Sequence, residues 1–230
     1  MQIKGFIGSS LIDWDGRITA VIFLSRCNLR CKFCHNKELI TKKQMEDIPF
    51  ESIEDYLIKN KKFLDGVVIT GGEPTLNKNL KELCQKIKGL NFKIKLDTNG
   101  SKPHIIKQLI NQHLIDYIAV DIKTVLIKEK YEELTSFCDV EKIKETMQII
   151  KNSNIEHEYR TTVIPKYHSF HIIIEIVKSL EPKKCFVLQN FKPETTLDPR
   201  LSKEKPYTQE ELNFIRQECL HYIPIVKTRY

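Results

Sequence analysis

Three cysteines, Cys27, Cys31 and Cys34, fall within eight residues in the stretch SRCNLRCKFCHN. A structural zinc ion needs four ligands, and the adjacent side chains of Cys34 and His35 would not readily bind the same tetrahedral ion. Three thiolates without a fourth suit a 4Fe–4S cluster in which one iron stays open for another ligand. The spacing therefore favours an iron–sulfur cluster, and a zinc-stabilised binding module is the alternative.

The other cysteines are isolated in the sequence. They are expected to be small buried side chains in helices or a strand rather than metal ligands: Cys84, Cys138, Cys185 and Cys219.

Polar and glycine-rich residues follow one apolar run after another along the chain. These are Gly71-Gly72-Glu73-Pro74, Asp97-Thr98-Asn99-Gly100, Asp121-Ile122-Lys123, Arg160 before Pro165, and Gln189-Asn190. In parallel α/β folds, ligands bind at the carboxyl ends of the strands. Loop chemistry explains such residues at one strand end, but their repetition at five strand ends, with the cysteine motif at a sixth, predicts that they surround a single site.

The elements that position these residues alternate between buried strands and amphipathic helices. Strands are predicted at 19–25, 66–70, 92–98, 116–123, 155–164 and 184–189, and helices at 51–64, 77–90, 103–114, 139–152, 171–180 and 208–222. Strands separated by helices run parallel, and six units are too few to close an eight-stranded barrel. We expect an α/β fold, either a partial, open parallel (β/α)6 barrel or a doubly wound sheet, in a single domain over residues 1–230. A short N-terminal hairpin strand turns at DWDG (13–16), and Thr208 with Glu211 forms a capping box.

Composition limits the class of protein. The chain has 230 residues, 41% of them apolar, and seven cysteines. We find neither a signal-peptide pattern at the N-terminus nor an apolar stretch of transmembrane length, so we expect a cytoplasmic protein without a membrane partner. The net charge of +7 comes from 30 lysines and 7 arginines against 30 acidic residues. Because nucleic-acid recognition favours arginine, we interpret the lysines as solvated helix faces and do not expect a nucleic-acid partner.

The cysteine spacing C-x3-C-x2-C, with Phe33 before the third cysteine, follows the first main strand and is joined by Gly-Gly-Glu-Pro after the second. In these motifs the chain resembles the radical S-adenosylmethionine superfamily. The resemblance implies a 4Fe–4S cluster on Cys27, Cys31 and Cys34 whose open iron binds S-adenosylmethionine. It also implies reductive cleavage of this cofactor to methionine and a 5′-deoxyadenosyl radical that abstracts hydrogen from the substrate.

The resemblance also implies roles for residues that bind S-adenosylmethionine. Phe33 is expected to pack near the adenine. The segment Gly71, Gly72 and Glu73 is expected to place its backbone carbonyls and the Glu73 side chain near the methionine ammonium. A tight turn would also explain the two glycines, and both interpretations can hold together.

Further cofactor contacts are implied at the next strand ends. Thr98 and Asn99 lie where the superfamily usually contacts the ribose, and Lys123 is placed to reach the methionine carboxylate. An ion pair between Asp121 and Lys123 on one strand face is the alternative for that lysine. Arg160 could serve either S-adenosylmethionine or the substrate.

Within the superfamily the chain is most similar to activating enzymes of glycyl-radical enzymes, particularly of anaerobic ribonucleoside-triphosphate reductases. Arg26 stands where that family usually has glycine, and Asp15 where proline is common. The similarity implies a glycyl-radical enzyme as partner, with anaerobic ribonucleotide reductase as first choice, and an electron donor such as flavodoxin or ferredoxin. A radical enzyme that acts on RNA or a small molecule is the alternative. The segments that carry this similarity are residues 5–39, TGGEPTL, LDTNG, VDIK, YRTTVIP and LQNFKPETTLDP.

Overall fold

The structure is a computed structural model that describes residues 2–41, 45–136 and 139–230. Cys138, predicted to be a buried apolar side chain, lies outside these residues. The strands form one eight-stranded sheet in the order β1-β2-β3-β4-β5-β6-β7-β8. No helix in the described part of the chain is long and apolar enough to cross a membrane.

The chain divides into two compact units that interleave along the sequence. The first unit comprises residues 1–28, 38–98 and 104–118, and the second comprises residues 29–37, 99–103 and 119–230. Each unit therefore takes up three separate segments. The expectation of a single domain over the whole chain stays a prediction.

In the first unit a hairpin begins the sheet. Strand β1 pairs with β2 in antiparallel orientation, and β2, β3 and β4 are parallel to one another. The strands are β1 (Ile3–Ser10), β2 (Thr19–Leu24), β3 (Gly66–Gly71) and β4 (Lys93–Thr98), and the helices are α1 (Lys37–Thr41), α2 (Phe50–Lys59), the 3-10 helix η1 (Pro74–Leu76), α3 (Leu80–Gly89) and α4 (Pro103–Asn111). Strand β2 reads TAVIFL and is buried along nearly its whole length, as expected for a strand covered on both faces.

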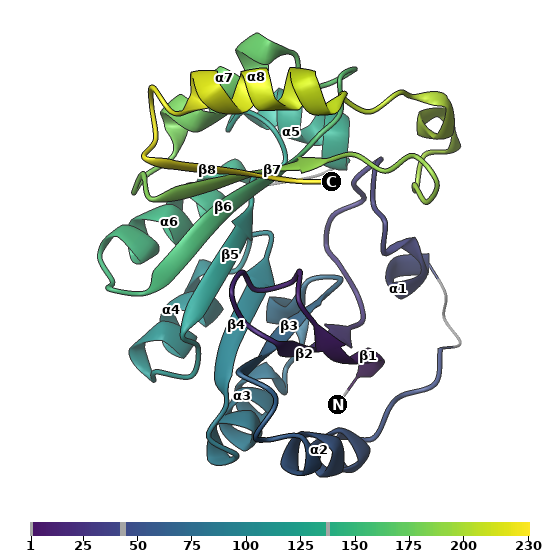
Figure 1. Cartoon of the computed structure of the whole chain (residues 1–230), viewed down its shortest axis with the longest axis vertical. Coiled ribbons are helices and arrows are strands. Elements are labelled where there is room, and N and C mark those ends of the chain that lie inside the picture. The colour runs from purple at the N-terminus through teal and green to yellow at the C-terminus, as the bar shows by residue number, and fades with distance from the viewer. Residues whose placement is uncertain (1, 42–44, 137–138) are drawn as a thin grey trace. The chain divides into compact units, whose positions relative to one another are not determined.

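The second unit continues the alternation. Strands β6, β7 and β8 are parallel to one another, and α8 lies beside α7 over β7 and β8 (Figure 1). The elements are β5 (Tyr117–Asp121), which continues from the first unit, α5 (Lys128–Thr135), α6 (Val140–Lys151), β6 (Glu156–Val163), α7 (Phe170–Ser179), β7 (Cys185–Asn190), the 3-10 helix η2 (Pro199–Lys203), α8 (Gln209–Cys219) and β8 (Ile225–Arg229). The predicted capping box is present, because Thr208 and Glu211 exchange hydrogen bonds at the start of α8.

The predicted fold class is confirmed. An N-terminal hairpin is followed by parallel strands with a helix in each connection, which is the α/β class of a partial, open β/α barrel. Helix α5 and strand β8 are absent from the sequence prediction, as are the short helix α1 and the two 3-10 helices. Helix α5 has only Tyr131, Leu134 and Thr135 buried, and strand β8 has only Val226 buried, so neither carries a strong apolar period.

Candidate active site

In the first unit the end of β3 is joined to the residues that precede Cys27. The backbone N–H of Gly72 donates to the carbonyl of Leu24 at 2.9 Å, and the N–H of Glu73 donates to the carbonyl of Arg26 at 2.7 Å. These hydrogen bonds extend the parallel pairing of β2 and β3, in which Leu24 is the partner of Gly71. The glycine-rich segment therefore fixes the backbone that leads into the first cysteine.

Both glycines are required by this close packing. A Cβ on Gly71 would lie 2.4 Å from the carbonyl oxygen of Leu24, and Gly71 has a φ of +118°. A Cβ on Gly72 would lie 1.9 Å from the carbonyl oxygen of Arg26. Real Cβ atoms do not approach backbone oxygens so closely, so only glycine fits at either position.

The side chain of Glu73 is fully buried and caps the helix η1. Its Oε1 accepts hydrogen bonds from the N–H of Thr75 at 3.1 Å and from the hydroxyl of Thr98 at 2.7 Å. The hydroxyl of Thr75 donates to the same oxygen. Because buried carboxylates need such partners, this network ties the end of β3 to the end of β4.

Arg26 adopts the left-handed backbone region, with a φ of +69°. This region disfavours side chains that carry a Cβ and is normally occupied by glycine. The resemblance leads us to expect glycine at this position, and the conformation is one that glycine adopts without strain. The arginine of this chain therefore keeps the backbone path that glycine would follow.

In the second unit a short turn joins the other two cysteines of the motif. The N–H of Cys34 donates to the carbonyl of Cys31 at 3.0 Å. Helix α5 anchors this loop, because its final carbonyls, on Leu134 and Thr135, accept hydrogen bonds from the N–H groups of Lys32 and Arg30. Carbonyls at a helix C-terminus lack partners within the helix, so the loop satisfies them.

Lys123 and Arg160, which lies within β6, both pair with Asp121 at the end of β5, and Phe33 lies against Lys123. The ammonium of Lys123 lies 5.7 Å from the centre of the Phe33 ring and 3.2 Å from Asp121 Oδ2. The Nε of Arg160 donates to Asp121 Oδ1 at 2.9 Å. The ion pair considered as the alternative for Lys123 is therefore present, and one carboxylate holds both cations in place.

The electrostatics of this cluster keep all three groups charged. Burial alone would raise the pKa of Asp121, but the charges of Arg160 and Lys123 outweigh it and hold this pKa well below its usual value. Burial alone would lower the pKa of Lys123, but the charge of Asp121, the charge of Cys31 and a hydrogen bond to Asp121 together outweigh it and raise this pKa above its usual value. The second unit thus presents two fixed cations, which suit a carboxylate of a ligand.

His168 lies fully buried behind Lys123, and the sequence interpretation did not include it. Burial lowers its pKa to about 4, so the ring is neutral near pH 7. Because the N–H of Ile164 donates to His168 Nδ1 at 3.1 Å, the ring proton must be on Nε2. That Nε2–H donates to the carbonyl of Lys123 at 2.8 Å and fixes the backbone from which the lysine extends.

Asn99 follows β4 and belongs to the second unit. Its side chain is buried, and its Oδ1 accepts the N–H of Ser101 at 3.0 Å. Next to it, Gly100 has a φ of +75°, and its carbonyl accepts the hydroxyl of Thr146 at 2.7 Å. The Thr-Asn-Gly stretch is thus a fixed turn rather than a loose loop.

The cysteines outside the motif are buried, as predicted for those that the structure describes. Cys84 on α3, Cys185 on β7 and Cys219 on α8 are each no more than 5% exposed. Burial raises the pKa of Cys84 and of Cys219 to about 12, so both thiols stay protonated. Since the thiolate is the form that binds metal, these two are poor candidates for cluster ligands.

A comparison with models of protein families identifies the family to which this chain belongs. Residues 21–178 match the family model described as the radical SAM superfamily. The chain belongs to the radical SAM superfamily. It is a radical SAM enzyme, and this membership implies a 4Fe–4S cluster and S-adenosylmethionine as cofactors.

One radical SAM relative is similar over the whole chain. A candidate glycyl-radical enzyme activating enzyme of Methanocaldococcus jannaschii is 34% identical over 238 aligned positions, which cover 99% of this chain and 95% of that protein.

Solved structures share the radical SAM fold at lower identity. Streptococcus suis SuiB bound to S-adenosylmethionine matches with a TM-score of 0.69 and 20% identity, over 89% of this chain and 48% of SuiB. A domain of the pyruvate-formate lyase-activating enzyme of Bacteroides vulgatus matches with a TM-score of 0.54 and 13% identity, over 72% of this chain and 99% of the domain. At these identities the likeness concerns the fold alone.

The residues of the radical SAM motif fit a cluster by the chemistry of their donor atoms. Cys31 is buried and Cys34 half-buried in one turn of the second unit, whereas Cys27 is half-buried in the first unit. Within the ranges that the structure describes, no group of three or more His, Cys, Asp or Glu side chains is gathered to hold a metal ion. The ligand assignment therefore rests on the sequence motif.

The structure thus brings the predicted site residues together in two sets, each within one unit. In the first unit a continuous network links Gly71, Gly72, Glu73 and Thr98. In the second unit Lys123 and Arg160 pair with Asp121, and Phe33 lies against Lys123. Their contacts with a cofactor stay predictions.

Proposed function

We propose that Cys27, Cys31 and Cys34 hold a 4Fe–4S cluster with one open iron. We further propose that the chain activates a partner glycyl-radical enzyme, with anaerobic ribonucleotide reductase as the first candidate. When bound, the cluster would supply the electron, received from a donor such as flavodoxin or ferredoxin, for the reductive cleavage of S-adenosylmethionine to methionine and a 5′-deoxyadenosyl radical, and that radical would take one hydrogen atom from a backbone glycine of the partner.

The observation that carries this proposal is the similarity to the candidate activating enzyme of Methanocaldococcus jannaschii. It extends over 99% of this chain and 95% of that protein at 34% identity. A shared fold alone would leave the substrate open, because one fold hosts many activities. Similarity over nearly the full length of both chains also includes the loops that would receive a substrate.

The residues of the second unit would bind two parts of S-adenosylmethionine. We assign the methionine carboxylate to Lys123, whose ammonium is fixed by Asp121 and whose backbone is fixed by His168. We assign the adenine to the neighbourhood of Phe33, over which that ammonium lies. Arg160, held by the same aspartate, is available to the cofactor or to the substrate backbone.

The first unit would bind the methionine ammonium through the backbone of Gly71–Glu73. The N–H groups of Gly72 and Glu73 already donate to neighbouring carbonyls, and Glu73 Oε1 already accepts three hydrogen bonds. We therefore assign the ammonium to backbone carbonyl oxygens of this segment. The Glu73 side chain would hold the segment in place through its hydrogen bonds to Thr75 and Thr98. Thr98 and Asn99 would then lie near the ribose.

The test uses anaerobically reconstituted protein with S-adenosylmethionine, a reductant and a glycyl-radical enzyme from the same organism. We expect electron paramagnetic resonance to show a glycyl doublet on the partner, because the flanking amide groups stabilise a radical on the glycine α-carbon. A partner in which the target glycine is replaced by alanine is the control and should give no doublet. Efficient turnover of RNA or a free metabolite, with no doublet on any glycyl-radical enzyme of that cell, would show that the proposed substrate is wrong.

A further inference from the structure

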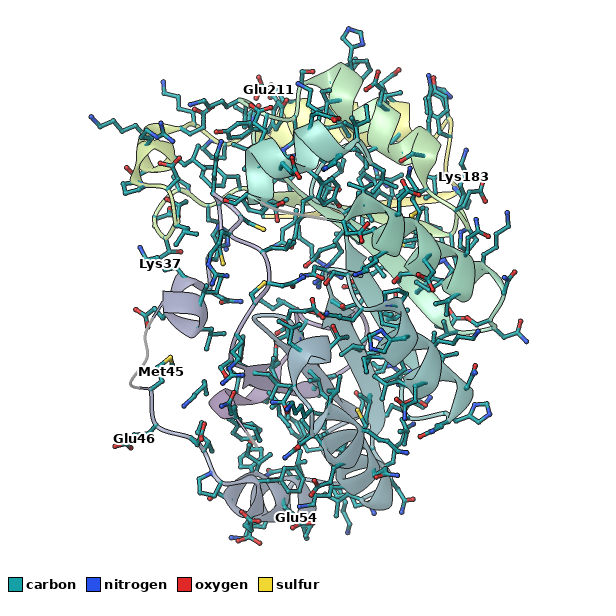
Figure 2. The ribbon with its side chains drawn as sticks, turned by 180° about the vertical axis from the view of Figure 1, so that it is seen from behind. Lys37, Met45, Glu46, Glu54, Lys183 and Glu211 are labelled. Carbon is teal, nitrogen blue, oxygen red and sulfur yellow. The ribbon has the colours of Figure 1, made fainter. Side chains whose placement is uncertain are left out.

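A cavity of about 380 Å³ lies in the second unit between the start of α7 and the first turns of α8. It has no part in the site described above. Figure 2 labels Glu211, an exposed residue that lines this cavity. We call the cavity the aromatic pocket, and its lining residues are Phe170, Tyr207, Glu210, Glu211, Phe214 and Ile215.

Aromatic rings form its walls. The rings of Phe170 and Phe214 are 5.8 Å apart with an angle of 36° between their planes. Phe214 is 60% exposed, although the outer face of a surface helix is normally polar. The hydroxyl of Tyr207 donates to the carbonyl of His168 at 2.6 Å, so this third ring is held in place. The pocket is thus lined by an exposed ring, Phe214, in contact with Phe170, and by the fixed ring of Tyr207.

Two carboxylates stand on the rim. Glu210 and Glu211 are exposed side chains in the first turn of α8. Hydrogen bonds from the backbone and hydroxyl of Thr208 hold Glu211 in position and lower its pKa. Acidic residues also stabilise the start of a helix, which explains their place on α8. It does not explain an exposed phenylalanine beside them, and the chain as a whole carries +7.

We propose that the aromatic pocket binds an arginine side chain of the partner protein. Aromatic faces attract cations, and a guanidinium can stack on a ring while it pairs with a carboxylate. The identity of the partner as a glycyl-radical enzyme rests on the function proposed above, whereas the chemistry of the pocket does not depend on it.

The place of the aromatic pocket in the fold supports a docking role. Helices α7 and α8 begin after the loops that follow the carboxyl ends of β6 and β7. Tyr207 bonds to the carbonyl of His168, and the ring of His168 bonds to the carbonyl of Lys123. Two hydrogen-bonded residues, Tyr207 and His168, would therefore connect an arginine bound here to Lys123, the lysine that we assign to the cofactor.

The first experiment titrates the full-length protein, carrying ¹³C-labelled phenylalanine, with acetyl-Gly-Arg-Gly-amide and with the same peptide containing neutral citrulline. We expect the arginine peptide to shift the NMR signals of Phe170 and Phe214 and the citrulline peptide to bind at least about fivefold more weakly. Phe214→Ala should weaken binding of the arginine peptide by about fivefold to thirtyfold. Glu210→Gln should weaken it by up to about fivefold, because this carboxylate is exposed to solvent.

Two matched variants serve as controls. Phe63→Ala removes a phenylalanine that is 56% exposed in the first unit, and Glu51→Gln removes an acid from the first turn of α2. Both should bind the arginine peptide as the wild type does. Equal binding of the two peptides, absence of binding, or equal losses in the control variants would overturn the proposal.

The second experiment uses the partner itself. Phe214→Ala should raise the KM for the glycyl-radical enzyme at least about fivefold and leave cleavage of S-adenosylmethionine without partner unchanged. If the wild type places no radical on the partner, the proposed function fails. The peptide titration still shows whether the aromatic pocket binds arginine. If sedimentation shows a dimer that Phe214→Ala converts to a monomer, the occupant is a second copy and the proposal is wrong.

Discussion

The neutral ring of His168 donates a hydrogen bond to the carbonyl of Lys123 at 2.8 Å. The same ring accepts the N–H of Ile164, so it connects the end of β6 to the second residue after β5. Only the neutral ring can make both bonds, because Nδ1 of a protonated ring carries a hydrogen and could not accept the N–H of Ile164. One buried histidine therefore fixes the backbone of the lysine that we assign to S-adenosylmethionine.

This relationship predicts how stability depends on pH. Burial lowers the pKa of His168 to about 4, from 6.5 for an exposed histidine. The unfolded chain therefore binds this proton more readily than the folded chain does. The contribution is fully present above pH 6.5 and is lost as the pH falls towards 4, by roughly 3 kcal/mol in total. In His168→Gln this part of the pH dependence should disappear.

Denaturant unfolding of the wild type and the variant at pH 7 and pH 5 measures the difference. His104→Gln, which replaces an exposed histidine on α4, is the control and should follow the wild type. If His168→Gln kept the wild-type difference between the two pH values, the neutral ring would not be the source of the effect.

The left-handed backbone of Arg26 predicts that glycine is the better residue there. Arg26→Gly relieves the strain at a φ of +69° and should raise the free energy of unfolding by about 0.5–1 kcal/mol, after the entropy of the more flexible unfolded chain is subtracted. Ser25→Gly, at the preceding residue whose φ is not positive, should lower it by about the same amount. Equal changes in both variants would remove backbone strain as the explanation.

The packing of the glycine pair predicts that Gly72→Ala destabilises the protein even without cluster or cofactor. The new Cβ would lie 1.9 Å from the carbonyl oxygen of Arg26, so the backbone must shift, at a cost of about 2 kcal/mol or more. Gly89→Ala is the matched control, because nothing lies within 4 Å of a Cβ at that helical position. It should be neutral or slightly stabilising. If Gly72→Ala were as stable as the wild type, packing against Arg26 would not be the reason for glycine at this position. Close approach of the cofactor would then be the remaining explanation.

The cluster assignment predicts which cysteines matter. Serine in place of Cys27, Cys31 or Cys34 should remove the visible absorption of the cluster, its iron and the cleavage of S-adenosylmethionine. Cys84→Ser and Cys219→Ser should keep the iron and lower stability by about 1–3 kcal/mol, because each buries a hydroxyl. Iron analysis of anaerobically purified variants makes the comparison. Loss of iron in Cys185→Ser would contradict the three-ligand assignment.

The six strand–helix units could be predicted because their strands are apolar runs and their helices carry a clear apolar face. The last strand could not, since β8 reads IVKTR and gains its place only by pairing with β7. The local chemistry of the glycine pair was also predictable, but its packing against Arg26 depends on the neighbouring strand. The role of His168 could not be predicted from the sequence, because its two hydrogen-bond partners, Ile164 and Lys123, come together only when β5 and β6 lie side by side.

The most direct test of the central claim follows the hydrogen atom. A cognate glycyl-radical enzyme is prepared with glycine that carries two deuterium atoms on its α-carbon, and the 5′-deoxyadenosine formed during activation is analysed by mass spectrometry. Our account predicts one deuterium in each 5′-deoxyadenosine and one molecule of it per glycyl radical. Unlabelled 5′-deoxyadenosine, formed while the radical accumulates on the deuterated partner, would contradict direct abstraction from glycine.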